Sequence, residues 1–328
     1  MIMADNSNLH YAKRAKNDEF YTRLTDIENE LKNYKGKFKG KVVFCNCDDP
    51  VFFKNGKMDS EKTSKFIVHF TLLFEHYGLK KLICLGYKKG QKATAYVYHG
   101  DLNRNGFDDE CEWEKIQLAG DGDFRSPESL AFLKEANVVV TNPPFSLFRE
   151  YVSTMEEYGK KYLLIGNMNA ITYKEIFPLI KENKLWLGIN PVKAFSTPQG
   201  TMQKFGNILW FTNIDHAKRH EQLLKDNPLL KDSTTQYKGN ENKYPKYDNY
   251  DAIEVSKVVD LPADYMGVMG VPITFLTRYN PEEFEILGAD EAEGTGFSNG
   301  LWITILTDKK QCVIAGEKIY KRIFIRRK

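Results

Sequence analysis

The sequence predicts an α/β protein with a mostly parallel sheet and helices on both of its faces. Through the first two-thirds of the 328 residues, short apolar runs alternate with longer segments of helical periodicity. Such alternation is typical of βα units, which place parallel strands in one sheet. No apolar run approaches the roughly 20 residues of a membrane span, so we expect no membrane association.

The composition favours a folded cytoplasmic protein. Hydrophobic residues make up 42% and the net charge is only +3, which argues against a disordered chain. The first residues lack the basic-then-apolar pattern of a secretory signal. Of the five cysteines only Cys45 and Cys47 are close, in a β-rich run with poor geometry for zinc, so we expect reduced thiols. We interpret His216 and His220, four residues apart, as surface or capping residues and expect no metal.

The expected strands are six short apolar runs bounded by charged or turn-forming residues. They lie at residues 41–47, 81–86, 137–141, 161–166, 185–188 and 207–212. Between the second and the third run, residues 88–119 are polar and contain Arg104-Asn105-Gly106, a hairpin-type turn signal. We therefore predict an inserted hairpin or an extension of the sheet edge there.

The expected helices are recognised by apolar periodicity and by their end signals. A helix is predicted over 60–77, and Gly78 supplies its stop. Its apolar face consists of Phe66, Phe70, Leu73 and Tyr77. Ser126-Pro127 combines an N-cap with a first-turn proline and opens a second helix. A third covers 147–158, and Thr172-Tyr173-Lys174-Glu175 predicts a capping box at the start of a fourth.

The alternating pattern ends near Asn213. Residues 226–250 are polar and rich in tyrosine, and short β-like runs follow. We therefore divide the chain into a first domain, 1–215, and a smaller region, 216–328. The last twelve residues hold six basic side chains and one acidic one. They form either a solvated terminal strand or a contact to phosphate groups, and the sequence favours neither.

The sharpest candidate site is Asn142-Pro143-Pro144-Phe145, which directly follows an expected strand. In parallel α/β sheets, ligands bind beyond the carboxyl ends of the strands. The Asn142 side-chain oxygen and the Pro143 carbonyl are acceptors for the N–H groups of an aromatic amine. Pro144 stiffens the loop, and Phe145 offers a flat face to a planar base. Adenine in DNA, adenine in RNA and a glutamine side chain all fit these groups.

Six stretches of the chain are long and unusual motifs. They are 18–22 (DEFYT), 42–50 (VVFCNCDDP), 120–126 (GDGDFRS), 139–148 (VVTNPPFSLF), 244–252 (YPKYDNYDA) and 268–276 (VMGVPITFL). With them the chain resembles the EcoRI-type adenine-specific DNA methyltransferases along nearly its whole length. The resemblance implies a Rossmann-like S-adenosylmethionine-dependent methyltransferase domain over 1–215 and a DNA target-recognition region over 216–328. It also implies methyl transfer to N6 of an adenine flipped out of duplex DNA.

The resemblance assigns site residues as well. Asn142, Pro143 and Phe145 hold the flipped adenine, and Pro144 shapes the loop. The cofactor-binding positions are Phe20, Tyr21 and Thr22 at the methionine end, Cys47, Asp48 and Asp49 in the loop after the first strand, and Asp123 and Phe124 near the adenine ring. Asp121 is the alternative to Asp123, and either Asp48 or Asp49 is a candidate for the ribose contact. The loop lacks the glycines that most methyltransferases have there, a departure that the EcoRI-type enzymes share.

The resemblance further implies a bacterial or phage-encoded enzyme that acts as a monomer on double-stranded DNA. A cognate restriction endonuclease acting on the same site, without a stable complex, is the second expected partner, and GAATTC is the candidate sequence. The tyrosine- and lysine-rich stretch 237–250 suits contacts to DNA, or forms a polar surface loop. An RNA adenine or protein glutamine methyltransferase, and a DNA-binding relative without catalysis, are the alternatives.

Overall fold

The computed structural model describes residues 21–48, 51–106, 108–196, 201–223, 235–290, 297–298, 300–301 and 311–328. The chain divides into two compact units. The first comprises Met1–Ala170 and Leu187–Asp215, and the second comprises Ile171–Trp186 and His216–Lys328. The chain thus enters the second unit briefly before it completes the first. Phe177 in this early segment packs on Phe297 of the second unit, with ring centroids 4.5 Å apart.

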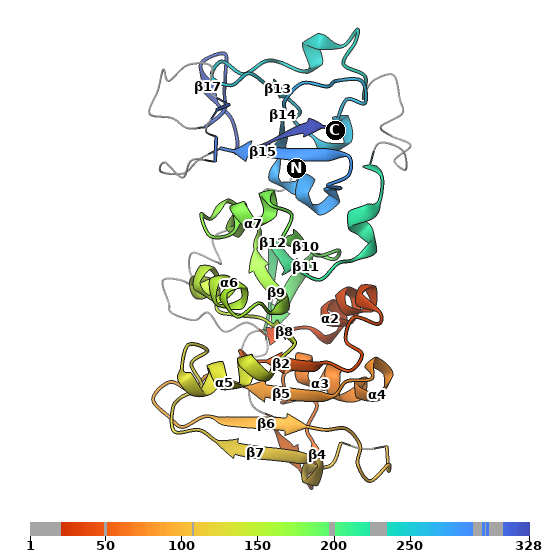
Figure 1. Ribbon diagram of the computed structural model, residues 1–328, viewed down its shortest axis with the longest axis vertical. Helices are drawn as coiled ribbons and strands as arrows, with labels where there is room; N and C mark the ends of the chain where they lie inside the picture. The colour runs from red at the N-terminus through yellow and green to blue at the C-terminus, as the bar shows by residue number, and fades with distance from the viewer. Residues whose placement is uncertain are drawn as a thin grey trace. The chain divides into compact units, whose positions relative to one another are not determined.

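The first unit is built on a ten-stranded sheet (Figure 1). Its order is β1-β11-β12-β9-β8-β2-β5-β6-β7, and β10 pairs with β12. The strands are β1 (Tyr21–Thr22), β2 (Val42–Cys45), β5 (Lys81–Leu85), β6 (Thr94–Tyr98), β7 (Trp113–Gln117), β8 (Val138–Thr141), β9 (Lys161–Asn167), β10 (Trp186–Leu187), β11 (Val192–Ser196) and β12 (Met202–Thr212). The expected α/β class with a large central sheet is confirmed.

Parallel pairing is confined to the four central strands of this sheet, in the order β9, β8, β2, β5. The ladders on either side of them are antiparallel. The expectation of a mostly parallel sheet is therefore wrong for the margins. The reason is that β6 with β7, and β11 with β12, are consecutive antiparallel partners that widen the sheet without crossover helices. The first of these pairs is the edge extension expected over 88–119.

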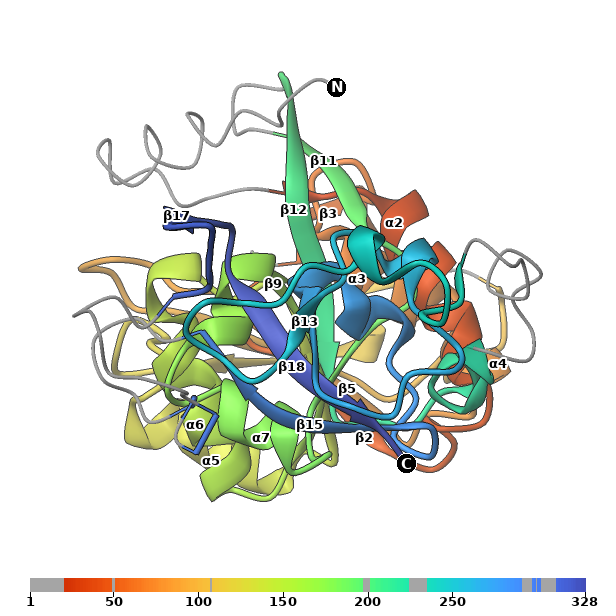
Figure 2. The same ribbon diagram turned by 90° about the horizontal axis from the view of Figure 1, so that it is seen from above.

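Helices cover both faces of this sheet (Figure 2). On one face lie α2 (Leu24–Leu31), α3 (Lys65–Leu72) and α4 (Phe74–Tyr77), and on the other lie α5 (Pro127–Glu135) and α6 (Phe148–Glu157). The alternation of side chains along β2 explains both contacts. Val43 belongs to the core cluster that includes Phe66 of α3. Phe44 points the opposite way, and its ring centroid lies 6.2 Å from that of Phe132 in α5.

Two of the predicted capping residues, Ser126 and Gly78, lie at helix ends in the structure. Ser126 caps α5, accepting a hydrogen bond of 3.2 Å from the Ser129 N–H. Gly78 ends α4 with a φ of 60°, as expected. The single helix predicted over 60–77 is wrong, because Leu73 leaves helical geometry and separates α3 from α4.

The capping box predicted over 172–175 is also wrong. The short helix η4 (Met168–Thr172) occupies its first position, and α7 (Phe177–Lys181) begins only after Ile176. Pro178 lies in the first turn of α7, where its missing N–H costs nothing, and this places the helix start later than the threonine.

Shorter elements complete the first unit. They are η1 (Lys32–Tyr34), the hairpin of β3 (Phe53–Lys54) and β4 (Lys57–Met58), η2 (Glu110–Glu112) and η3 (Phe145–Leu147). None of the helices in the described stretches is long and apolar enough to cross a membrane.

The second unit contains a four-stranded sheet in the order β13-β14-β18-β15. Its elements are η5 (Ala217–His220), η8 (Glu241–Lys243), β13 (Ile253–Glu254), η9 (Val258–Asp260), β14 (Met269–Pro272), η10 (Ile273–Arg278), β15 (Phe284–Ala289), β16 (Val313–Ile314), β17 (Glu317–Lys318) and β18 (Arg322–Arg327). Tyr247 and Tyr250 are core residues that pack with Phe324 of β18. The tyrosines of 237–250 therefore include core residues, which cannot contact DNA bases from this position.

The basic C-terminal strand is held by contacts within the unit. Arg322 is buried and pairs with Glu254, with Nη2 and Oε1 2.5 Å apart. Arg326 pairs with Glu285 at 2.9 Å, and Lys328 donates to the Pro281 carbonyl at 2.7 Å. The structure thus favours a structural role for this end of the chain over a contact to phosphate.

Among the described residues of the second unit, Asp290 is the most deeply buried acidic side chain, with only 1% of it exposed. It accepts hydrogen bonds from the Arg322 N–H at 3.0 Å and from the Cys312 thiol at 3.3 Å. Burial raises the pKa of Asp290 to about 6.

We expect this pKa to make the stability of the protein depend on pH. The ordinary pKa of an aspartate is about 4, so the folded state keeps a proton that the unfolded state loses. The resulting stabilisation is complete below pH 4 and is lost as the pH rises through 6, by about 3 kcal/mol in all. Urea unfolding of the wild type and of Asp290→Asn between pH 4 and 7 isolates this contribution, because every other titration is shared. A difference in unfolding free energy that does not change with pH would contradict the assignment.

Candidate active site

The order of the central strands defines where a ligand would bind. β2 pairs with β5 on one side and with β8 on the other. The chain therefore runs from β2 to β5 and then returns across β2 to form β8, which makes a topological switch point. In such sheets the ligand site lies beyond the carboxyl ends of the strands at the switch point. Asn46–Asp48 follow β2 and Asn142–Phe145 follow β8 at this edge.

Asp48 is the charged centre of this edge. It is buried, and its two carboxylate oxygens accept hydrogen bonds from two hydroxyls. Ser64, the N-cap of α3, donates to Oδ1 at 2.6 Å, and Thr141 donates to Oδ2 at 2.7 Å. The Asp48 N–H in turn donates to the Leu85 carbonyl of β5 at 3.3 Å. These bonds fix Asp48 between both neighbouring strands and the start of a helix.

The two residues before Asp48 are held as firmly. The Cys47 N–H donates to the Thr141 hydroxyl at 3.2 Å. Asn46 accepts a hydrogen bond from the Tyr151 hydroxyl of α6 through its side-chain oxygen. Desolvation, with the nearby Asp48 carboxylate as a second cause, raises the pKa of the Cys47 thiol. Cys47 is therefore a protonated thiol at neutral pH and not a nucleophile.

The loop after β8 turns sharply. The Pro144 carbonyl accepts a hydrogen bond of 3.0 Å from the Leu147 N–H and so opens η3. Pro143 is buried, whereas Asn142 and Phe145 are half-buried. The two consecutive prolines fix φ where this turn begins, so the start of the loop has little conformational freedom.

Phe145 connects this loop to β11, the second strand from one end of the sheet. Its ring packs against Phe195 of β11, with centroids 6.4 Å apart. In the β1–β11 ladder, Phe195 is the register partner of Thr22, and Tyr21 is the partner of Ser196. The structure therefore brings Tyr21 and Thr22 to strands beside the 142–145 loop. Phe20 and Asp49, the two other predicted cofactor residues of these segments, lie outside the described residues.

Asp123 and Phe124 reach the same edge through β5. Gly122 has a φ of +81°, and a Cβ there would lie 2.5 Å from the Gly86 carbonyl oxygen after β5. Asp123 receives two hydrogen bonds from the Arg125 guanidinium, at 2.6 and 2.8 Å, which lower the pKa of the Asp123 carboxyl. Phe124 is only 5% exposed, and its ring centroid lies 4.9 Å from that of Tyr151.

Sequence reasoning missed the residues that join these segments. They are Asn46, Ser64, Thr141, Tyr151 and Phe195. Ser64 had a readable signal, since a serine before an apolar periodic segment is a typical N-cap. Thr141 and Asn46 are single polar residues at the ends of apolar strands, and this position was their only signal. Tyr151 and Phe195 looked like ordinary core aromatics, because their role depends on which strands are neighbours.

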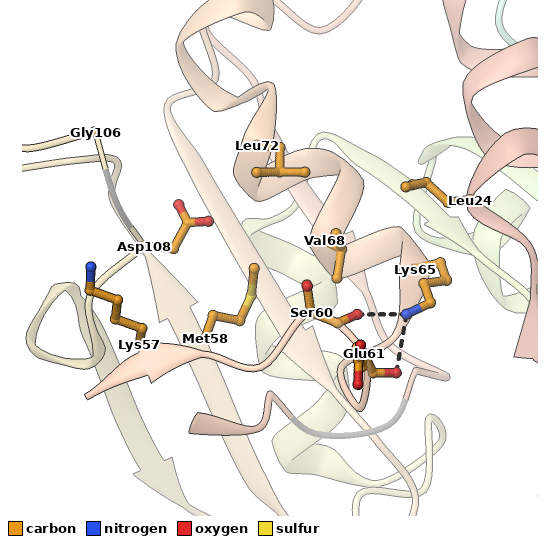
Figure 3. A pocket seen from close by; sticks show the side chains of 10 residues that line it. All are labelled: Leu24, Lys57, Met58, Ser60, Glu61, Lys65, Val68, Leu72, Gly106 and Asp108. Carbon is orange, nitrogen blue, oxygen red and sulfur yellow. Dashed lines mark hydrogen bonds between the residues drawn. The ribbon is translucent and has the colours of Figure 1, made fainter. Parts of the chain in front are cut away.

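A separate pocket of about 470 Å³ opens elsewhere in the first unit (Figure 3). It is lined by Leu24, Lys57, Met58, Ser60, Glu61, Lys65, Val68, Leu72, Gly106 and Asp108. The Lys65 ammonium is held by the carbonyls of Ser60 at 2.5 Å and Glu61 at 3.1 Å, so it is not presented to a ligand. None of the predicted site residues that the structure describes is among the residues that line this pocket. Within the described stretches, no group of three or more possible metal ligands occurs.

Comparison with known proteins gives one family. The model of the family described as "Adenine-specific methyltransferase EcoRI" matches residues 8–328. The chain is 44% identical to the type II methyltransferase M.EcoRI of Escherichia coli, over 99% of this chain and 98% of that protein. It is 39% identical to the type II methyltransferase M.MpnI of Mycoplasma pneumoniae, over 85% of each chain. No solved structure shows significant similarity to the chain.

Gly122→Ala tests the close approach of the 120–124 loop to the end of β5. An alanine at a positive φ costs about 1 kcal/mol, and the clash with the Gly86 carbonyl adds about 1–3 kcal/mol. Gly106→Ala is the matched control, because Gly106 has a φ of +79° but open space around its Cβ position. We expect the Gly122 variant to lose clearly more unfolding free energy in urea than the Gly106 variant. Equal losses would show that the approach is not tight.

Proposed function

Because the chain belongs to the EcoRI family of adenine-specific methyltransferases, we propose that its 142–145 loop holds an adenine of duplex DNA for methylation at N6. The observation that carries this proposal is the position of Asn142-Pro143-Pro144-Phe145 at the switch point, beside the loop that follows β2. The base and the methyl donor then meet at one edge of the sheet, where two adjacent strands end.

The 142–145 loop activates the amine. The lone pair of an aromatic amine is delocalised into the ring, which makes the nitrogen a weak nucleophile. The Asn142 side-chain oxygen and the Pro143 carbonyl accept hydrogen bonds from the two N–H groups and so return electron density to the nitrogen. Phe145 stacks on the base, and its packing against Phe195 keeps the ring in place.

The methyl donor of this class of enzyme is S-adenosylmethionine, and the residues at the edge suit it. Two buried polar atoms, the Asn46 Nδ2 and the Thr22 Oγ1, have no hydrogen-bond partner among the described residues. A buried polar group without a partner costs free energy, so these atoms favour a polar ligand. Carboxylates of Asp48, Asp49 and Asp123 are acceptors for ribose hydroxyls and for an adenine amine. When bound, the donor supplies a methyl group on a positively charged sulfur.

The protein contributes positioning more than chemical groups. The thiol of Cys47 is protonated, so nucleophilic catalysis by this residue has no support. Holding the amine in line with the methyl group is the main contribution of the protein to the rate. Reactants that are already oriented lose less translational and rotational entropy on reaching the transition state. The base must leave the duplex to reach this position, which the enzyme achieves by flipping it.

We assign target recognition to the region 216–328, and we propose that the enzyme works on double-stranded DNA as a monomer, since each strand of a palindromic site is methylated separately. A restriction endonuclease with the same recognition sequence is the proposed second partner. The exposed lysines of 237–250, among them Lys238 and Lys246, are candidates for phosphate contacts.

The first measurement is methyl transfer from radiolabelled S-adenosylmethionine to unmethylated genomic DNA and to a duplex that contains GAATTC. We expect the label on DNA adenine, and we expect Asn142→Ala to lower the rate by about 10²–10³-fold, the usual effect of removing one preorganised polar group. Binding of S-adenosylmethionine should persist in this variant, because its contact is to the base. Asn137→Ala, at the opposite end of β8, is the control, with rates expressed per folded protein.

The same assay separates the competing functions. Label on RNA or on protein glutamine would keep the amine chemistry and reject DNA as the substrate. Binding of S-adenosylmethionine without transfer to any of these would indicate a DNA-binding relative that lacks catalysis. Transfer that is unaffected by Asn142→Ala would reject the assigned site.

A further inference from the structure

Thr141 lies between the two halves of the site. It is the last residue of β8 and is 0% exposed. Its hydroxyl donates to Asp48 Oδ2 at 2.7 Å and accepts from the Cys47 N–H at 3.2 Å. The next residue in the chain is Asn142. One side chain therefore connects the loop that would bind the methyl donor to the loop that would bind the base.

The Thr141 hydroxyl connects β2 and β8 beyond the last pair of their backbone ladder. The ladder between β2 and β8 consists of the pairs Val43↔Val138 and Phe44↔Val139. Beyond these pairs, the Thr141 side chain holds the two strand ends together. Strand pairing alone would thus leave the two loops free to move relative to each other, just where the reacting groups must be aligned.

We propose that Thr141 is a positioning residue that locks the loop Asn46–Asp48 to the loop Asn142–Phe145. This inference rests on the proposed function, in which the two loops hold the two reactants. Methyl transfer requires the amine and the methyl group to be in line, and a misplacement of about 1 Å costs on the order of 10²-fold in rate. Thr141 would maintain this alignment through Asp48 and without touching either reactant.

Thr212 provides a matched control in the same sheet. It is the last residue of β12 and is also 0% exposed. Its hydroxyl donates to the Tyr162 carbonyl at 2.7 Å and accepts from the Ile214 N–H at 3.0 Å. Because β12 runs antiparallel to β9, this threonine lies at the opposite edge of the sheet, away from both loops. Its hydroxyl is equally buried, but its two bonds reach neither the loop Asn46–Asp48 nor the loop Asn142–Phe145.

The test compares Thr141→Val, Thr141→Ser and Thr212→Val in the full-length protein. Calorimetric titration gives the Kd for S-adenosylmethionine without DNA, methyl transfer at saturating donor and DNA gives kcat, and urea unfolding gives stability. We expect Thr141→Val to weaken donor binding about tenfold, since a hydrogen bond to a carboxylate is lost. We expect it to lower kcat by about 10–100-fold, whereas Thr141→Ser restores both values to within about threefold.

The Thr212→Val variant defines the outcome that would overturn the proposal. Thr212→Val should destabilise the protein to a similar degree and leave Kd and kcat within about twofold of wild type, because its hydroxyl is equally buried but remote. If Thr141→Val behaves like Thr212→Val, or if serine does not rescue it, the proposal is overturned. Thr141→Ala replaces the valine variant if valine prevents folding, since it removes the hydroxyl without placing a methyl group against Asp48.

Failure of the proposed function gives a different result. If the wild type binds S-adenosylmethionine but transfers no methyl group to DNA, the assigned activity fails, while the binding titration still decides whether Thr141 organises the donor loop.

Discussion

The site depends on the parallel pairing of β2 with β8. This pairing exists because the chain crosses back over β2 after forming β5, and it brings the Asp48 loop and the Asn142 loop to one edge. Asp48 then requires donors, since a buried carboxylate without hydrogen bonds costs several kcal/mol. Thr141 and Ser64 supply them, so the loop conformation follows from the need to satisfy one charge. The geometry of the site is thus set by strand order first and by buried polarity second.

A second buried carboxylate anchors the loop that precedes β11. Glu30 of α2 is buried and accepts hydrogen bonds from the N–H groups of Ile189 and Asn190, at 2.9 and 2.7 Å. Burial raises its pKa, although these bonds partly offset the effect. A Cβ at Gly188 would lie 2.3 Å from the Glu30 Oε1, so the loop can approach only as glycine. This loop leads into β11, which carries Phe195 against Phe145. A side chain of α2 therefore holds the start of the strand whose Phe195 packs against Phe145.

Local sequence signals are sufficient to predict the helix ends that depend only on residues in the same turn. Ser126 and Gly78 act where they were expected, because a cap or a left-handed glycine needs only its own turn. The 142–145 loop is predicted as a site because its residue types fit one chemistry after a strand. The antiparallel margins of the sheet and the contact between Phe145 and Phe195 depend on which strands are neighbours, and periodicity does not contain that information. The late start of α7 shows a proline overriding an otherwise valid pattern, and the break at Leu73 has no counterpart in the periodicity of the sequence.

The second unit shows why charge counted along a sequence is a poor guide to a nucleic-acid surface. The last strand combines the densest basic residues with apolar ones, yet its arginines serve the fold. Arg322 neutralises Glu254, and Arg326 pairs with Glu285. A cation that already has an internal partner must give it up before it can bind a phosphate, and for the buried Arg322 the cost of leaving Glu254 unpaired is several kcal/mol. In the proposed function, counterion release therefore has to come from cations outside such pairs, such as the exposed Lys246 of the stretch 237–250, whereas Lys243 pairs with Asp260. The buried tyrosines of that stretch provide the rigid support from which those lysines project.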